Sequence, residues 1–212
     1  MTNIVIKLLF CYCLGLLVLG CDKETKEVNC PITYGTLVDP RDGSRYATVS
    51  ICTQLWMAQN LRYELEGALL NPSNPGTEYG RLYSYDQALK VCPNGWHLPT
   101  DEEWRTLEEA LGMTKEETEK IGWRGEKEGQ FLKSTTEWNQ KENSSNSAGF
   151  RAVPAGYHKE EYLDMGGQAY FWTASAVDDK NAWGRSLKGE QKKIKRSQEN
   201  RSVYQSCRCI MD

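Results

Sequence analysis

The chain has 212 residues, a formal net charge of -3 and 39% hydrophobic residues, with 7 Trp and 11 Tyr. This composition is too apolar for a disordered chain and suits one globular domain with an appendage. The slightly acidic balance argues against a nucleic-acid partner, because the one basic cluster, residues 188–196, is short and indicates a solvated strand face. Only 2 histidines, His97 and His158, are present, so we expect no histidine-built metal site and no metal or other cofactor.

The first residues, 1–20, have the pattern of an export signal. Lys7 supplies a positive charge, residues 8–20 carry none, and a very polar stretch follows. The apolar run is shorter than the roughly 20 residues of a transmembrane helix, so a removed signal is favoured over a retained span. Its end, Val18-Leu19-Gly20-Cys21, resembles the bacterial lipobox, in which the cysteine is acylated and becomes the first residue. The resemblance implies lipidation at Cys21; an ordinary secretory signal is the alternative.

A polar tether, residues 21–32, follows the signal. It resembles the export tethers of Bacteroidetes surface lipoproteins, and this implies a place in the bacterial cell envelope, on the outer membrane and exposed at the surface. The membrane is then a partner through the lipid anchor.

The next elements are predicted as short strands and then helices. Alternating residues predict strands at 35–38 and 45–51 around a turn at 39–43, and residues 72–80 predict a loop. Ser84 with Gln87 and Thr100 with Glu103 form capping boxes, which mark helix starts. The second helix, residues 101–111, places Trp104, Leu107 and Leu111 on one face, so it packs on the core. Its first acids, residues 101–103, are explained by the helix macrodipole. Thr114 with Glu117 marks a third, short helix.

The second half of the domain reads as a long irregular region, residues 122–147, and then a series of strands. Turn residues separate predicted strands at 150–153, 155–158, 170–174, 182–187, 192–197 and 202–210. Strands, two helices, an irregular region and more strands indicate one α+β domain.

One phrase makes the family recognisable: Cys92-Pro93-Asn94-Gly95-Trp96-His97-Leu98-Pro99-Thr100 resembles the Fibrobacter succinogenes major paralogous domain family. Similar pieces occur in order from Asp39 to Asp212, among them Trp56-Met57-Ala58-Gln59-Asn60-Leu61 and Phe171-Trp172-Thr173-Ala174-Ser175. The resemblance covers residues 33–212. It implies an α+β C-type lectin-like fold with two helices packed on antiparallel strands and a long irregular loop region.

Five cysteines remain after Cys21, and in an exported protein they are expected to oxidise. The family resemblance implies a disulfide between Cys92 and Cys209. Cys52 and Cys207 depart from the family pattern, and two departures of the same kind predict a second bridge, Cys52 to Cys207, with Cys30 left in the tether. A bridge from Cys30 to Cys52 is the alternative.

No pattern of residues marks a catalytic site, so we expect a protein that is not an enzyme. His97, at a helix entry, is interpreted as a structural hydrogen-bonding residue. The calcium-site triplets of true C-type lectins do not occur. The phrase at Trp96 also resembles formylglycine-generating enzymes, which hold copper with a thiolate pair, but Cys92 and Cys209 are expected to be structural.

Aromatic residues of the irregular region and the late strands are the ligand-binding candidates, because exposed rings can stack on sugars and give rigid contact area. They are Trp123, Trp138, Tyr157, Tyr162 and Trp183. The sequence thus predicts a lipid-anchored, exported, non-catalytic module that binds an extracellular ligand, a glycan or a surface protein. The alternatives are an enzyme related to the formylglycine-generating oxidases, and a structural subunit of a surface assembly that uses a strand edge or Cys30 between chains.

Overall fold

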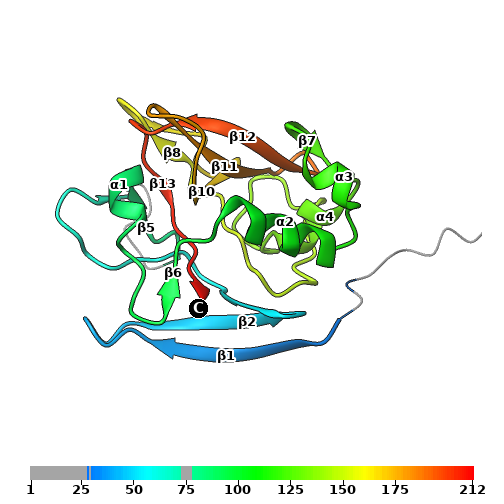
Figure 1. The fold of residues 1–212 in the computed structure, drawn as a ribbon, viewed down its shortest axis with the longest axis horizontal. Helices are drawn as coiled ribbons and strands as arrows, with labels where there is room; N and C mark the ends of the chain where they lie inside the picture. Colours follow the sequence, from blue (N-terminus) through cyan, green and yellow to red (C-terminus); the bar gives the residue numbers. More distant parts are fainter. Residues whose placement is uncertain (1–27, 29, 73–77) are drawn as a thin grey trace, which may run out of the picture.

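The computed structural model describes residues 28, 30–72 and 78–212. In this part of the chain one sheet faces another, and α2 lies between them (Figure 1). The first sheet has the order β1-β2-β3-β14-β6. Its strands are β1 (Ile32–Val38), β2 (Arg45–Ile51), β3 (Gln54–Met57), β14 (Ile210–Met211) and β6 (Trp96–His97). All its pairings are antiparallel.

The second sheet has the order β4-β5-β13-β10-β11-β12-β7, and only the pairing of β10 with β13 is parallel. Its strands are β4 (Leu69–Leu70), β5 (Arg81–Tyr83), β13 (Gln205–Ser206), β10 (Gln168–Ala176), β11 (Asn181–Lys188), β12 (Ile194–Asn200) and β7 (Gly122–Arg124). A separate hairpin joins β8 (Tyr157–His158) to β9 (Tyr162–Leu163). The predicted strands at 45–51, 182–187 and 192–197 are therefore present, with small shifts of their ends.

Four short helices are present in the described residues. They are α1 (Tyr85–Ala88), α2 (Asp101–Ala110), α3 (Lys115–Thr118) and α4 (Glu128–Leu132). Both predicted capping boxes are formed, at Ser84 and at Thr100. Thr114 caps α3 by accepting a hydrogen bond from the backbone N–H of Glu117. The three helix starts were therefore predicted correctly.

The predicted α+β, C-type lectin-like class is wrong, because the molecule is mostly β, with 36% strand and 13% helix. A capping box marks where a helix begins and not how far it extends. The helix from Ser84 stops after one turn, since the chain there bends to bury Val91 and to join Cys92 to Cys209. The region predicted as irregular also supplies β7 and α4.

The main core lies between the two sheets, where aromatic rings from four segments meet. Trp56 of β3 contacts Trp104 of α2 with ring centroids 5.2 Å apart, and Phe150 contacts Phe171 of β10 at 6.0 Å. All four side chains are fully buried. Edge-to-face contacts of this kind add to the large stabilisation from burying aromatic area. This core confirms the inward face predicted for Trp104 and Leu107.

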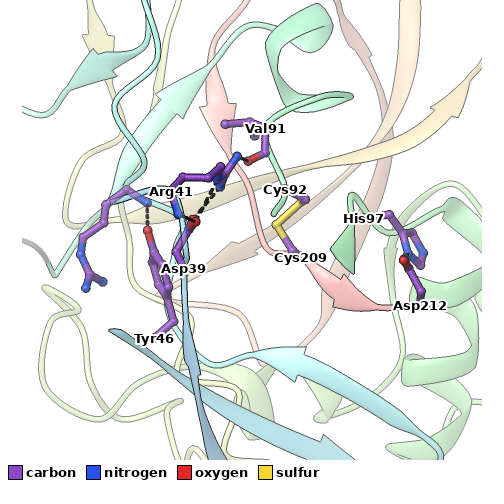
Figure 2. Close-up of a disulfide and its surroundings, with 9 residues drawn as sticks. Asp39, Arg41, Tyr46, Val91, Cys92, His97, Cys209 and Asp212 are labelled. Carbon is purple, nitrogen blue, oxygen red and sulfur yellow. Dashed lines mark hydrogen bonds and ion pairs between the residues drawn. A yellow bond between two sulfur atoms is a disulfide. The ribbon is translucent and has the colours of Figure 1, made fainter. Parts of the chain in front are cut away.

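The disulfide between Cys92 and Cys209 is present, as the family resemblance implied (Figure 2). It joins the segment before β6 to the segment before β14. Close by, Arg41 holds the 39–43 turn against this segment, because its guanidinium contacts the carboxylate of buried Asp39 and donates to the carbonyl of Val91 at 2.9 Å.

The predicted bridge between Cys52 and Cys207 is wrong. Cys52 is joined to Cys30, which was the alternative, and Cys207 is a buried free thiol. Register explains the choice: Ile32 pairs with Ile51, so Cys30 and Cys52 lie at the same end of the β1–β2 ladder. Cys207 lies elsewhere, with its carbonyl accepting a hydrogen bond from the backbone of Leu61.

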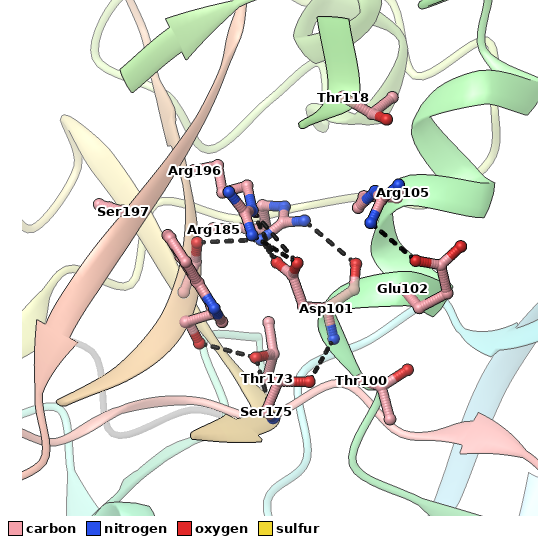
Figure 3. Close-up of polar contacts among 12 residues, drawn as sticks. Thr100, Asp101, Glu102, Arg105, Thr118, Thr173, Ser175, Arg185, Arg196 and Ser197 are labelled. Atoms are coloured by element: carbon pink, nitrogen blue, oxygen red, sulfur yellow. Dashed lines mark hydrogen bonds and ion pairs between the residues drawn. The ribbon is translucent and has the colours of Figure 1, made fainter. Parts of the chain in front are cut away.

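A cluster of buried ions fixes α2 to the second sheet (Figure 3). Asp101 accepts hydrogen bonds from Arg185 at 2.7 Å and from Arg196 at 2.8 and 2.9 Å. Glu108, fully buried, accepts from Arg185 at 2.7 Å and also from Arg124. Two predictions are corrected here. The macrodipole does not account for Asp101, and the 188–196 cluster is not simply a solvated face, because Arg196 is buried.

The predicted export signal, residues 1–20, and the lipidation residue Cys21 lie outside the described residues. Within the described part of the chain, helices are all too short to cross a membrane.

Candidate ligand-binding surface

The second sheet has two faces of different character. Residues of the inner face, such as Phe171, Arg185 and Arg196, are directed toward α2 and the core. Because side chains alternate along a strand, the neighbours of these residues lie on the opposite face. There Tyr170 pairs with Ser186, and Ser186 pairs with Lys195. We call this opposite side the outer face.

A pair of tyrosines covers part of the outer face. Tyr157 of β8 and Tyr170 of β10 lie with ring centroids 4.8 Å apart, and both remain partly exposed. The hydroxyl of Tyr170 donates a hydrogen bond to the Asp164 carboxylate. Burial and then the Asp164 carboxylate raise the pKa of both phenols, so they stay protonated donors. The pair presents aromatic edges together with hydroxyl groups.

Glu199 of β12 extends the outer face beyond these rings. Its carboxylate accepts hydrogen bonds from Ser197 Oγ at 2.6 Å and from Gln205 Nε2 at 3.4 Å. The side chains meet above Gly184, where a Cβ atom would come within 2.8 Å of Glu199 Cγ. A larger residue at position 184 would therefore displace Glu199.

Two polar atoms under this surface have no hydrogen-bond partner in the described residues. They are Ser186 Oγ and Gln205 Oε1, and both side chains are fully buried. A buried polar group without a partner destabilises the fold by about 1–3 kcal/mol.

The structure brings only some of the predicted ligand residues onto the outer face. Tyr157 lies there, and Trp123 of β7 joins it, because Trp123 pairs with Lys195. Trp183 is on the inner face, and the Arg196 guanidinium lies 3.5 Å from its ring centroid. Trp138 is only 1% exposed and donates its indole N–H to the carbonyl of Ala152, so its ring offers no surface to a ligand.

Residues on the outer face that the sequence did not single out are Tyr170, Asp164 and Glu199. Tyr162, by contrast, contacts His158 in the β8–β9 hairpin at 4.8 Å. Strand alternation could have placed Tyr170 opposite Phe171. Which of these two faces was covered could not be predicted, because α2 covers one of them through contacts distant in sequence.

The predicted structural role of His97 is confirmed. Its Nδ1 lies 2.7 Å from Asp212, which follows β14 (Figure 2). Its Nε2 lies 2.8 Å from Glu103, so the ring links the end of β14 to the start of α2. Among the described residues, groups of three His, Cys, Asp or Glu side chains suited to a metal ion are absent.

Comparison with curated proteins and with solved structures gives no match. The family model does match: residues 49–211 fit the Fibrobacter succinogenes major domain, and the chain belongs to this family.

Proposed function

We propose that this chain is a lipid-anchored, exported and non-catalytic module that binds an extracellular ligand, a glycan or a surface protein, through the outer face of its second sheet. The observation that carries the proposal is the partly exposed Tyr157–Tyr170 pair beside Glu199, above buried polar atoms with no partner in the described residues. Aromatic rings with a few fixed polar groups are the usual components of a ligand surface.

The position of this face supports the proposal. The chain enters the fold at β1, and Cys30 is joined to Cys52 at that end. β1 and β2 form one side of the molecule, whereas β8 and β12 lie on the opposite side (Figure 1). An anchor at Cys21 would attach through the tether to the β1 side, so the outer face would be directed away from the bilayer.

The cysteines favour binding over the alternative of an enzyme related to the formylglycine-generating oxidases. That alternative needs two free thiols in one pocket, but Cys92 and Cys209 are joined. Cys207 is the one free thiol of the described residues, and burial raises its pKa, so it stays a neutral thiol.

A structural subunit of a surface assembly is a second candidate, and β1 favours it. Cys30 forms a bridge within the chain, but β1 is an edge strand of seven residues without a charge, and Tyr34 on it is 71% exposed. Unprotected edges of this kind can pair with another strand. Light scattering, which measures the molar mass in solution, tests this second candidate. The wild type is expected to assemble and the variant Tyr34→Lys to be monomeric, whereas a monomeric wild type would contradict the candidate.

The experiment for the binding function uses the protein from residue 22 onward on a glycan array and on intact cells. Tyr157→Ala is expected to weaken binding roughly tenfold, about 1.4 kcal/mol. Tyr34→Ala is the matched control, since it removes an exposed tyrosine from the opposite side and is expected to leave binding unchanged. Equal binding by wild type and Tyr157→Ala, or no binding to either class of ligand, would contradict the proposal.

A further inference from the structure

A small pocket opens where the outer face ends, at the start of β10 and the end of β11. Its volume is about 150 Å³, several times the roughly 30 Å³ that one water occupies in the liquid. Three loops form it, with the lining residues Asn139, Gln140, Gly167, Lys188, Gly189 and Glu190. It is thus large enough to hold part of a small ligand in place of several waters.

The turn that forms one wall of the pocket is held from below. Lys133 is 0% exposed, and its ammonium donates hydrogen bonds to the carbonyls of Lys188 at 2.8 Å, Gly189 at 3.2 Å and Gln191 at 2.7 Å. Asn143 Nδ2 donates to the carbonyl of Glu190 at 3.1 Å. Burying a lysine is costly unless its hydrogen bonds are satisfied. Here they are satisfied by the turn, and the wall is fixed before any ligand arrives, which lowers the cost of ordering it on binding.

The polar groups of the pocket suit an uncharged, hydroxyl-rich molecule. The carboxamides of Asn139 and Gln140 each donate and accept, as a hydroxyl group does, and both residues are exposed. Lys188 and Glu190 form an ion pair at 3.1 Å, so their charges offset each other. An anionic ligand would meet Glu190 and a cationic one would meet Lys188. Gly167 and Gly189 also line the pocket, and their backbones are hydrogen-bonded to each other, because the Gly189 N–H donates to the carbonyl of Gly167 at 3.0 Å.

The pocket and the tyrosine pair lie on one continuous face. Leu187 belongs to the core, so Lys188 is directed to the outer side, where it pairs with Gln168. Tyr170 is two residues further along the same face of β10, a step of about 7 Å in a strand. A ligand longer than one ring can therefore reach from the pocket to Tyr170 and Tyr157.

We propose that the outer face binds a neutral oligosaccharide, with one sugar in the pocket between Asn139, Gln140 and the 188–190 turn and the next against the Tyr157–Tyr170 pair. This deepens the proposed function and rests on it. The recognition is by hydroxyl hydrogen bonds and ring contact, and it needs no ion.

NMR titration tests the proposal on the protein from residue 22 onward. The probes are neutral trisaccharides of glucose, mannose, galactose and N-acetylglucosamine, with oligogalacturonate and chitosan oligomers as anionic and cationic comparisons. We expect one neutral trisaccharide to shift the side-chain amides of Asn139 and Gln140 and the backbone amides of Gly167 and Gly189 saturably. The double variant Asn139→Ala/Gln140→Ala is expected to raise its Kd at least roughly tenfold.

Two variants act as controls. Asn94→Ala removes an exposed asparagine elsewhere and is expected to keep the wild-type Kd. Tyr157→Phe keeps the ring, and its Kd is expected to stay within about twofold of wild type, a change of about 0.4 kcal/mol. Tyr157→Ala removes the ring, and its Kd is expected to rise by more than this. Asn94 is exposed and Tyr157 is partly exposed against the core, so circular dichroism checks that each variant folds.

The outcomes separate this proposal from the broader one. Binding of the charged oligomers alone would contradict the proposed oligosaccharide site but not the broader binding function. The same holds if the double variant still binds and the shifts lie around Trp123 only. A failure of every saccharide to bind also overturns the pocket. In that case a surface protein that binds wild type but not Tyr157→Ala would still support the binding function.

Discussion

Asp101 and Glu108 hold α2 against the second sheet through charges that are largely shielded from water: the Asp101 side chain is 11% exposed and that of Glu108 is 0% exposed. Burial disfavours the charged form of Asp101, but Arg196 and Arg185 more than offset this and lower its pKa. Burial also lowers the pKa of Arg124 to about 10. A buried network of this kind stabilises less than its contacts suggest, but breaking it leaves charges without partners.

The substitution Glu108→Gln tests how much stability is lost when the buried ion cluster is broken. The change leaves Arg124 without its buried countercharge and Arg185 with Asp101 alone, and we expect a loss of about 3–5 kcal/mol in the free energy of unfolding, measured in urea. The matched control is Glu102→Gln on the same helix. Glu102 pairs with Arg105 but is largely exposed, so its loss should cost less than about 1 kcal/mol. Equal effects of the two changes would contradict the role given to the cluster.

His97 makes stability depend on pH. Burial alone would lower its pKa, but the hydrogen bonds to Asp212 and Glu103 raise it above its usual value of about 6.5. A raised folded-state pKa means that the stabilisation is fully present below the unfolded pKa and is lost as pH rises through the folded pKa. Urea unfolding between about pH 5.5 and pH 8.5 should show this decrease in wild type.

In His97→Asn the decrease should be absent, since no imidazolium forms. Asp212→Asn should show a smaller decrease than wild type, because Glu103 still contacts the ring. A wild-type profile that is retained in His97→Asn would assign the pH dependence to other groups.

At the level of elements, the two disulfides close loops of different length. Cys92 and Cys209 are 117 residues apart and Cys30 and Cys52 are 22 apart. In the chain-entropy model, the long loop should contribute about 5 kcal/mol and the short one about 3 kcal/mol. We expect Cys92→Ser/Cys209→Ser to lose more stability than Cys30→Ser/Cys52→Ser, as measured by the midpoint of urea unfolding. The reverse order would mean that strain in the folded state or residual structure in the unfolded chain, rather than loop length, sets the contribution of each disulfide.

For the whole molecule, the lipid anchor is the prediction with the widest consequence. Cys21→Ser should move the protein from the membrane pellet to the soluble fraction after cell lysis, because the acyl chains supply the membrane affinity. Cys30→Ser is the matched control: it changes a cysteine nearby in sequence, and the protein should stay in the pellet. Radiolabelled palmitate should enter wild type and Cys30→Ser only. A Cys21→Ser protein that remains in the pellet would exclude this anchor.

Local features of the sequence predicted local features of the fold. The capping boxes at Ser84, Thr100 and Thr114 marked three helix starts, since each depends on residues three apart. Alternation predicted β2, and the turn residues around it predicted the strand that forms β11, because both signals lie within short stretches of sequence. The capping box at Ser84 predicted no end for α1, which stops after Ala88.

The sequence by itself determined the family, the bridge implied between Cys92 and Cys209, the structural place of His97, and the position of the longer strands β1, β2, β10, β11 and β12. Only the tertiary structure decided that Cys52 joins Cys30, that Asp101 and Glu108 are buried, that Trp138 is core, and that Tyr157 meets Tyr170 and Glu199. These depend on which strands are neighbours and which face α2 covers. Periodicity states that a strand has two faces, but only the packing of distant segments determines which of them water reaches.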